Sequence, residues 1–416
     1  MNRMLQSAAL LKAVSKSARY AERSGVGRPC YLTDTSWPAV GIAVQPPFDS
    51  KLSAFKSVER HAVSVTSPKT IIQHAPLNLS WLDKLREDAL DPTLAIIDPH
   101  HHLWDRWGGY FLGELLADLR SDHNIVATMF AQCGHAYRAT GPEALWPVGE
   151  TEFVVSVAKQ ADSLNLGMRV CAGIIGHADL TLGSEVDAVL GAHIEVSDGR
   201  FRGIRQVTAR HPDFEAGVLA PPPLHQMLDA KFREGFARLA GFNLSFDAWV
   251  YHSQLEELRD LAAAFPETSI IVNHCGGPLG VGPYAGKRNE VFQDWRARLV
   301  ELAQLDNVAM KLGGLGMSIM GFDFHKRPLP PSSVELAAAW RPYMETCIEL
   351  FGADRCMFES NFPVDKPMCS YPVLWNAFKR IAASASKSEK QALFHANAAH
   401  IYRLDLAAPV VPAAAK

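Results

Sequence analysis

The sequence predicts an α/β fold, a (β/α)8 TIM barrel with an irregular N-terminal extension. From about residue 94, short apolar runs alternate with segments of helical periodicity, and eight of each follow in order. Alternating strands and helices imply a parallel sheet with right-handed crossovers, and eight units favour a closed barrel over an open sheet. The chain contains no G-x-G-x-x-G fingerprint and no P-loop, which argues against the usual open-sheet nucleotide-binding folds.

The expected elements follow from this alternation. The strands are apolar runs at 94–98, 125–131, 169–175, 201–205, 242–249, 269–274, 308–312 and 356–360. The helices lie near 151–162, 184–194, 224–240, 253–264, 289–304, 334–351 and 373–385, with a shorter one after the first strand and a closing one at 388–402. The strand-to-helix connections at 132–150, 275–288, 313–333 and 361–372 are long and rich in Gly and Pro. Because such loops form the mouth of a barrel, we expect the active site there.

The sequence divides into an extension at 1–90, a barrel at 91–406 and a flexible tail at 407–416. Residues 1–22 are basic and contain no acid before Glu22, which resembles a mitochondrial transit peptide, although a solvated helix has the same pattern. Residues 24–75 hold many Pro and Ser without sustained periodicity and predict an irregular arm. We expect a cytoplasmic protein, with the mitochondrial matrix as the alternative.

Charge and cysteine usage exclude several classes of protein. A net charge of -3 without a basic stripe argues against nucleic-acid binding. No window approaches the roughly 18 consecutive apolar residues that a membrane span needs. Seven widely spaced cysteines without a C-x-x-C pair argue against a disulfide framework and indicate a reducing compartment. We therefore expect a small-molecule substrate as the partner, and the sequence leaves a homo-oligomer open.

Histidines follow two of the expected strands. Asp98, His100 and His102 share one parity at the end of the first strand, and His101 falls on the other. Two imidazoles two residues apart can bind one metal ion from the same side, whereas a loop of surface histidines is the alternative. His274 ends the strand at 269–274 and is a candidate third ligand or proton-transfer group; the alternative is a core histidine bonded to the backbone.

Charged residues at other strand ends are candidate substrate contacts. Arg205 ends the strand at 201–205 and would suit a substrate carboxylate through paired hydrogen bonds. Asp247 shares its parity with Ser245, and the apolar parity of that strand should face the helices, so Asp247 or the nearby His252 could contact substrate or metal. Lys311 is a further cation in an apolar run, with a structural salt bridge to Glu359 as its alternative role.

The last expected strand carries acids and an amide. Glu359 and Asn361 share a parity, which places Glu359 deeper in the barrel than Asn361. An ionised carboxylate at that depth needs a cation or a metal nearby. Asp365 lies in the loop that follows and is a candidate base.

The region from about 97 to 404 resembles the amidohydrolase superfamily, in particular its amidohydrolase-2 group, which includes 2-pyrone-4,6-dicarboxylate lactonase-like and sugar-lactonase-like proteins. The matching pieces are, in order, IDPHHHLWD, RGIR, LSFDAW, VNHCGGP, NVAMKLGGL, RCMFESNFPVDK and NAAHIYRL. The resemblance implies that His100 and His102 form the H-x-H pair and that His274 is the third histidine. It also implies water attack on a lactone, ester or amide carbonyl, a divalent metal such as Zn, and a base on the last strand.

The chain departs from this family at three acids. The family commonly reads Gly-Ser-Asp-Trp-Pro at the last strand, where this chain has Asn361 in place of the Asp. Asn273 and Gln132 are two further amides where relatives carry acids, and an amide cannot act as a general base. Either Glu359 or Asp365 takes over the missing role, or the protein works with weakly bound metal or without metal.

Three functions remain open from the sequence. The first is hydrolysis of a small carboxylated lactone, ester or amide by the histidines and Arg205. The second is non-oxidative decarboxylation, which related metal-dependent barrels perform. The third is a barrel that has lost catalysis with its base at Asn361 and only binds a ligand.

Overall fold

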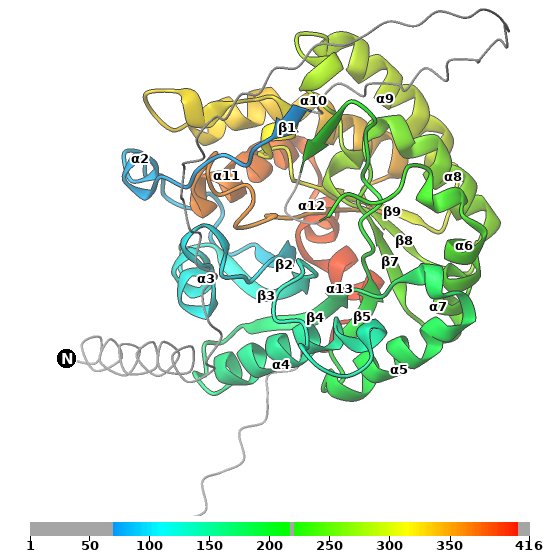
Figure 1. Cartoon of the computed structure of the whole chain (residues 1–416). Coiled ribbons are helices and arrows are strands. Elements are labelled where there is room, and N and C mark those ends of the chain that lie inside the picture. Colours follow the sequence, from blue (N-terminus) through cyan, green and yellow to red (C-terminus); the bar gives the residue numbers. More distant parts are fainter. Residues whose placement is uncertain (1–69, 217–219, 407–416) are drawn as a thin grey trace, which may run out of the picture. The chain divides into compact units, whose positions relative to one another are not determined.

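The computed structural model describes residues 70–216 and 220–406, and it forms the predicted barrel. Eight strands make one parallel sheet in the order β2-β3-β4-β5-β7-β8-β9-β10 (Figure 1). They are β2 (Ala95–His101), β3 (Asn124–Ala131), β4 (Arg169–Gly176), β5 (Phe201–Ile204), β7 (Ser245–Ala248), β8 (Ile270–Val272), β9 (Val308–Leu312) and β10 (Cys356–Phe358). The predicted targeting segment at 1–22, most of the predicted arm and the tail at 407–416 lie outside the described residues.

The barrel closes between β2 and the residues that follow β10. His101 pairs with Phe362 in a parallel bridge. The backbone N–H of His102 donates to the carbonyl of Phe362 at 2.8 Å, and that of Asn361 donates to the carbonyl of His100 at 2.9 Å. The histidine run and the Asn361 segment therefore meet along the seam that closes the sheet.

Helices surround the strands (Figure 1). They are α3 (Leu112–Leu119), α4 (Val148–Asp162), α5 (Val186–Val196), α6 (Ala230–Phe236), α7 (Arg238–Gly241), α8 (Leu255–Ala264), α9 (Arg288–Leu302), α10 (Ser333–Phe351) and α11 (Tyr371–Ile381). The closing helix is divided into α12 (Lys387–Gln391), a π-helical turn (Ala392–Ala396) and α13 (Asn397–Ile401). The strand expected at 242–249 begins only at Ser245, because α7 continues to Gly241 and Asn243 has a left-handed φ of 54°.

Two apolar clusters form the core on the two sides of the sheet. Inward-facing residues of the strands fill the barrel together with Tyr402, and they include Ile97, Ala127, Met129, Ala172, Ile175, Ile271, Ala309 and Met357. Outside the sheet, Phe246 packs against Phe236 with ring centroids 5.1 Å apart. The neighbouring Asp247 lies inside the barrel, as the alternation along this strand predicted.

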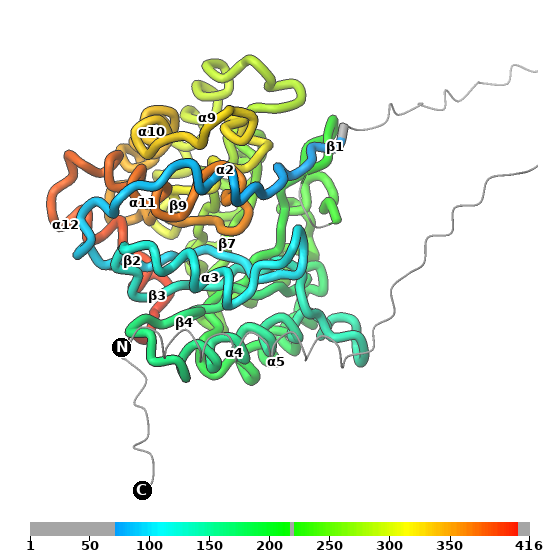
Figure 2. The backbone as a smooth tube through the Cα atoms, turned by 90° about the vertical axis from the view of Figure 1, so that its left-hand side faces the viewer, coloured from blue at the N-terminus to red at the C-terminus, as the bar shows by residue number. Residues whose placement is uncertain are grey.

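A second small sheet was not predicted. β1 (Thr70–Ile72) pairs in parallel with β6 (Phe214–Ala216), and Figure 2 shows β1 at the end of the barrel opposite α12. Both strands have three residues, too few for a period to be recognised, and β1 lies in a segment that reads as irregular.

The rest of the described extension packs on the barrel. After β1 comes α2 (Leu79–Leu82), where the indole of Trp81 donates to the carbonyl of Arg327 at 2.9 Å. The backbone N–H of Leu90 donates to the side chain of Asn376 at 2.8 Å. Among the described residues, no helix is both long and apolar enough to cross a membrane.

Candidate active site

A cavity opens where the strands of the barrel end. Its floor is formed by residues that come shortly after six different strands: His102, Cys133, Arg205, Trp249, His274 and Asn361. The hollow measures about 890 Å³, including the space that is open to solvent. This is the end of a parallel barrel at which active sites are found. The long connections predicted at 132–150, 313–333 and 361–372 all contribute lining residues.

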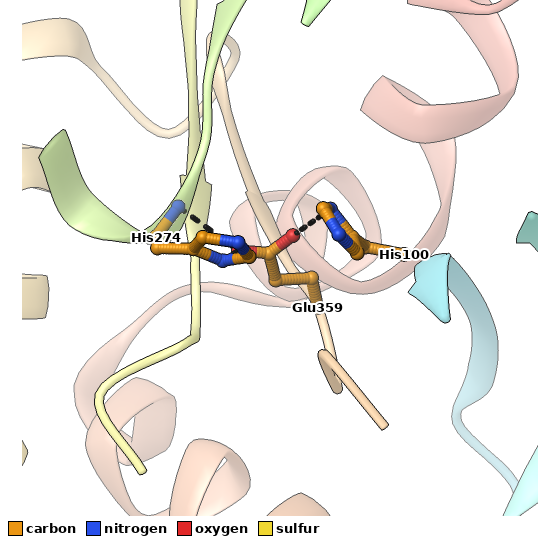
Figure 3. A group of neighbouring side chains, drawn as sticks. All are labelled: His100, His274 and Glu359. Carbon is orange, nitrogen blue, oxygen red and sulfur yellow. Dashed lines mark hydrogen bonds and ion pairs between the residues drawn. The ribbon is translucent and has the colours of Figure 1, made fainter. Parts of the chain in front are cut away.

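A buried carboxylate joins two histidines at this floor (Figure 3). Glu359 Oε1 lies 2.7 Å from His274 Nδ1 and accepts the backbone N–H of the same residue at 3.0 Å. Glu359 Oε2 lies 2.8 Å from His100 Nδ1. Arg205 donates to His100 Nε2, so the proton of the neutral His100 ring lies on Nδ1 and faces Oε2, which has no other polar neighbour among the described residues. We call Glu359, His100 and His274 the Glu359 cluster.

The hydrogen bonds of the histidines fix which ring nitrogens carry protons. A carboxylate or carbonyl oxygen can only accept, so Nδ1 of His274 donates to Glu359 and Nδ1 of His102 donates to the carbonyl of Ala131 at 2.7 Å. Burial lowers the pKa of His274, and it lowers that of His102 well below its usual range. Both residues line the cavity, and each neutral ring keeps Nε2 unprotonated.

The charge of Glu359 is maintained by its neighbours. Burial by itself would raise its pKa, but His274 and His100 hold the pKa of this carboxyl well below its ordinary value. Burial lowers the pKa of His100 well below its usual range, against the opposing effect of Glu359. The cluster is therefore a carboxylate between two neutral imidazoles.

Arg205 lines the cavity but is already bonded on both edges. Its Nε donates to Gln132 Oε1 at 3.0 Å, and its Nη2 donates to the backbone carbonyl of Gln132. Its Nη1 lies 3.1 Å from His100 Nε2. Burial lowers the pKa of Arg205, although a guanidinium remains charged in proteins. Gln132, predicted as a substrate contact, holds Arg205.

A second buried group lies inside the barrel and does not line the cavity. Lys311 Nζ donates to Asp247 Oδ2 at 2.7 Å and to the carbonyl of Pro99 at 2.9 Å. The Tyr402 hydroxyl lies 3.0 Å from both oxygens of Asp247, and Asn273 Nδ2 donates to Oδ2 at 3.1 Å. The salt bridge suggested between Lys311 and Glu359 is wrong, because the partner of the ammonium is Asp247. We call Asp247, Lys311, Asn273 and Tyr402 the Asp247 cluster.

Asn361 lines the cavity, and Asp365 holds it in place. Asn361 Nδ2 donates to Asp365 Oδ1 at 2.8 Å, and the backbone N–H of Gly316 donates to Asp365 Oδ2 at 2.8 Å. Burial raises the pKa of Asp365 to about 8. With both oxygens bonded and no surface on the cavity, Asp365 is placed as a support for Asn361.

Backbone strain marks two of the lining residues. His274 and Asn361 have φ values of 56° and 54°, in the left-handed region that residues other than glycine rarely adopt. Strained conformations of this kind are concentrated at functional sites, where the surrounding structure holds them. Both residues therefore have positions that the fold maintains at an energetic cost.

The remaining predicted residues lie elsewhere. His252 lines a separate hollow with His211, Tyr284 and Asp294, so the structure does not bring it to the cavity. His101, on the opposite parity to His100 and His102, lies 2.9 Å from the Thr128 hydroxyl and does not line the cavity.

The donors that could hold a metal differ from the predicted set. Within residues 70–216 and 220–406, one group of three donors has its ligand atoms within 4.8 Å of one another: His100, His274 and Glu359. His102, which was predicted as a ligand, is not in that group, and Glu359 stands in its place. Only His274 of the three lines the cavity.

Several residues that line the cavity were not predicted from the sequence. Trp249 ends the strand predicted at 242–249 and Tyr251 lies two residues beyond it, so their position could have identified them. Trp104 lies two residues beyond His102, with its ring stacked on that imidazole at 5.3 Å. Ile72 and His74 also line the cavity, and no signal in the sequence points to them.

Comparison with known proteins agrees with this fold. The family model Amidohydro_2, described as Amidohydrolase, matches residues 97–404. The chain therefore belongs to the amidohydrolase family.

Individual relatives match over nearly their whole length. The uncharacterized protein y4mH of Sinorhizobium fredii is 35% identical, over 75% of this chain and 99% of its own. An L-fucono-1,5-lactonase of Burkholderia multivorans is 28% identical, over 74% of this chain and 96% of its own. A crystal structure of an amidohydrolase from Burkholderia multivorans with bound zinc shares the fold, with a TM-score of 0.59 at 23% identity, over 75% of this chain and 100% of that chain.

About a quarter of the chain has no counterpart in these relatives. The family match begins at residue 97 and ends at residue 404, close to the end of the chain. The segment before residue 97 is therefore the only stretch outside the match that is long enough to account for that quarter.

Proposed function

We propose that the chain is a hydrolase that adds water to the carbonyl of a lactone or ester. The observation that carries this proposal is His274, whose Nδ1 is held by the buried Glu359 at 2.7 Å while its unprotonated Nε2 belongs to a residue on the cavity floor. A neutral imidazole oriented by a carboxylate is a competent general base.

The reaction follows from these two residues. His274 Nε2 takes a proton from a water as its oxygen bonds to the carbonyl carbon, and Glu359 stabilises the imidazolium that forms. The C–O bond to the leaving oxygen then breaks, and that oxygen receives the proton back from His274. The chain's own groups thus return to their starting state after one molecule of water has been consumed.

Arg205 and His102 complete the floor. The guanidinium of Arg205 is held by Gln132 and His100, so it provides a fixed positive charge for the negative charge that develops on the carbonyl oxygen. His102 presents its unprotonated Nε2 on the same cavity and can hold the attacking water. Asn361, fixed by Asp365, offers an amide for orientation rather than a base.

The donor types of the Glu359 cluster suit a divalent ion, whereas the positive charges of Arg205 and Lys311 beside His100 oppose one. Nitrogen and oxygen donors of this kind suit zinc, and an ion on Glu359 Oε2 would have to displace only the proton of His100 Nδ1. Held by His100, His274 and Glu359, such an ion would supply Lewis-acid polarisation of the carbonyl.

The bond type and the substrate charge rest on different observations. The L-fucono-1,5-lactonase relative supports a lactone. The carboxylated substrate inferred from Arg205 has no such support, because both edges of the guanidinium are bonded to Gln132 and His100. Arg205 is also the only lysine or arginine among the described residues that line the cavity. We therefore propose that the substrate has no carboxylate that binds to Arg205.

The test is a His274→Gln variant of the full chain, assayed with a six-membered lactone in heavy-oxygen water. We expect kcat/KM to fall on the order of 10³-fold, with the label found in the wild-type product. His252→Gln is the matched control, since His252 lines a separate hollow, and its activity should equal that of the wild type.

Two outcomes would overturn the proposal. Release of carbon dioxide from a carboxylated substrate, without label in the product, would make the chain a decarboxylase. Failure to open any lactone or ester, with equal ligand binding by the wild type and His274→Gln, would make it a binding protein.

A further inference from the structure

The cavity has a wall that the barrel itself does not supply. Ile72, Gln73 and His74 line it, and we call these three residues the N-terminal wall. They precede the family match, in the segment that has no counterpart in the relatives described above. Part of the binding surface is therefore formed by a segment that these two relatives do not match.

The N-terminal wall is fixed to the mouth of the barrel. β1, which ends at Ile72, pairs with β6 in the loop after β5. The His74 ring stacks on Trp107 with centroids 3.7 Å apart, and its Nε2 lies 3.0 Å from the carbonyl of Val364. A segment held by a strand pair, a ring stack and a polar contact can shape a binding site.

The walls of the cavity are mainly apolar, in contrast to its floor. The large side chains that form them include Ile72, Val207, Tyr251, Met317 and Ile319. His74 adds little polarity, because Nδ1 lies 2.7 Å from the carbonyl of Ala75 and Nε2 faces that of Val364. A substrate with many hydroxyl groups would lose more hydrogen bonds to water against such walls than Gln73 and Ser318 could replace.

We infer that the N-terminal wall makes this enzyme specific for a lactone with an apolar body, an alkyl-substituted or aryl-substituted ring rather than a polyhydroxylated sugar ring. The inference rests on the proposed hydrolysis. The carbonyl meets His274 and Arg205 at the floor, and the apolar substituent packs between Ile72 and the aromatic residues after β7. The lactone opens by water addition as described above, so no further reactant is needed.

The first test compares three six-membered lactones on the full-length wild type: the unsubstituted ring, the ring with a pentyl chain, and the ring with hydroxyl groups. Each CH₂ group that is buried on binding raises kcat/KM about fourfold. The kcat/KM of the pentyl lactone should therefore exceed that of the hydroxylated lactone at least about tenfold. Preference for the hydroxylated ring, with His274→Gln inactive on it, would overturn the inference and leave the proposed function standing. If none of the three opens, the proposed function fails as well.

The second test asks whether the N-terminal wall causes the preference for the pentyl lactone. Ile72→Asn should raise KM for the pentyl lactone about tenfold, and this increase should be several times larger than that for the unsubstituted lactone. Ile71→Asn is the matched control, because Ile71 is the adjacent residue, is 71% exposed and does not line the cavity. Ile72→Ala, a milder change, serves if the first variant unfolds at a lower temperature than the wild type. Equal KM values for the Ile71 and Ile72 variants would overturn the role of the wall.

Discussion

The Glu359 cluster and the Asp247 cluster contain similar residues, but only the Glu359 cluster reaches the cavity. Each holds a fully buried carboxylate near the end of a strand, and the two meet where Lys311 Nζ comes within 3.4 Å of His100 Nδ1. Asp247 is enclosed by an ammonium, a hydroxyl and an amide, and none of its partners lines the cavity. Glu359 is bonded to His274, which does line the cavity, and its second oxygen faces His100 alone.

The difference shows that partners, more than residue type, decide what a buried carboxylate does. The hydroxyl of Tyr402 lies beside both carboxylate oxygens of Asp247, so we expect the Asp247 cluster to hold the barrel together. The Glu359 cluster ends in an imidazole whose outer nitrogen can exchange a proton with a ligand. Catalysis should therefore depend on one cluster and stability on the other.

The largest expected effect separates the two clusters by activity. Glu359→Gln should lower kcat on the order of 10³-fold, because an amide cannot stabilise the imidazolium and its N–H₂ opposes the Nδ1–H of His100 or His274. The melting temperature should fall less than in a variant that leaves a buried ammonium unpaired, because the imidazoles around Glu359 are neutral. An active Glu359→Gln enzyme would show that His274 works without its carboxylate.

The next effect falls on stability. Asp247→Asn should lower the free energy of unfolding by about 3 kcal/mol, because Lys311 would be left as an unpaired buried ammonium. Turnover per folded molecule should stay within about threefold of wild type, less than 1 kcal/mol of barrier. Urea unfolding and a lactone assay on the same sample measure both.

A double variant controls that prediction. Asp247→Leu with Lys311→Met removes both charges, and a buried pair replaced by apolar residues often regains the stability lost when one partner is removed. Recovery of stability with retained turnover would sharpen the contrast between the clusters. Retained stability with lost turnover in Asp247→Asn would assign Asp247 to catalysis instead.

The same contrast explains how far the sequence could predict the site. Alternation along the strands placed His100 and His102 on one side of β2 and Asp247 inside the barrel, because side-chain direction in a strand is local. It could not choose between Asp247 and Glu359 as the partner of Lys311, since that depends on distances across the barrel. The tautomers of His102 and His274 likewise depend on acceptors from other strands.

The sequence placed one residue wrongly in the site and missed another, and these two errors have different physical causes. His252 follows a strand end as His274 does, but the turn after β7 carries it to a separate hollow, and loop paths are not fixed by periodicity. Ile72 was missed because a three-residue strand stabilised by pairing with β6 leaves no period to recognise. The barrel itself was predictable, because eight repeats of one pattern reinforce each other.

The smallest expected effect concerns divalent ions, and it depends on charges from both clusters. Lys311 and Arg205 lie 3.4 Å and 3.1 Å from the two nitrogens of His100, and they already offset the charges of Asp247 and Glu359. A divalent ion would leave this buried region with excess positive charge, which is costly in a low-dielectric interior. We therefore expect the purified protein to hold well below one zinc per chain by mass spectrometry. Chelation should lower kcat by no more than about threefold. A stoichiometric zinc content that is lost together with activity would show that the ion overcomes Arg205 and Lys311, and that the Glu359 cluster works as a metal site.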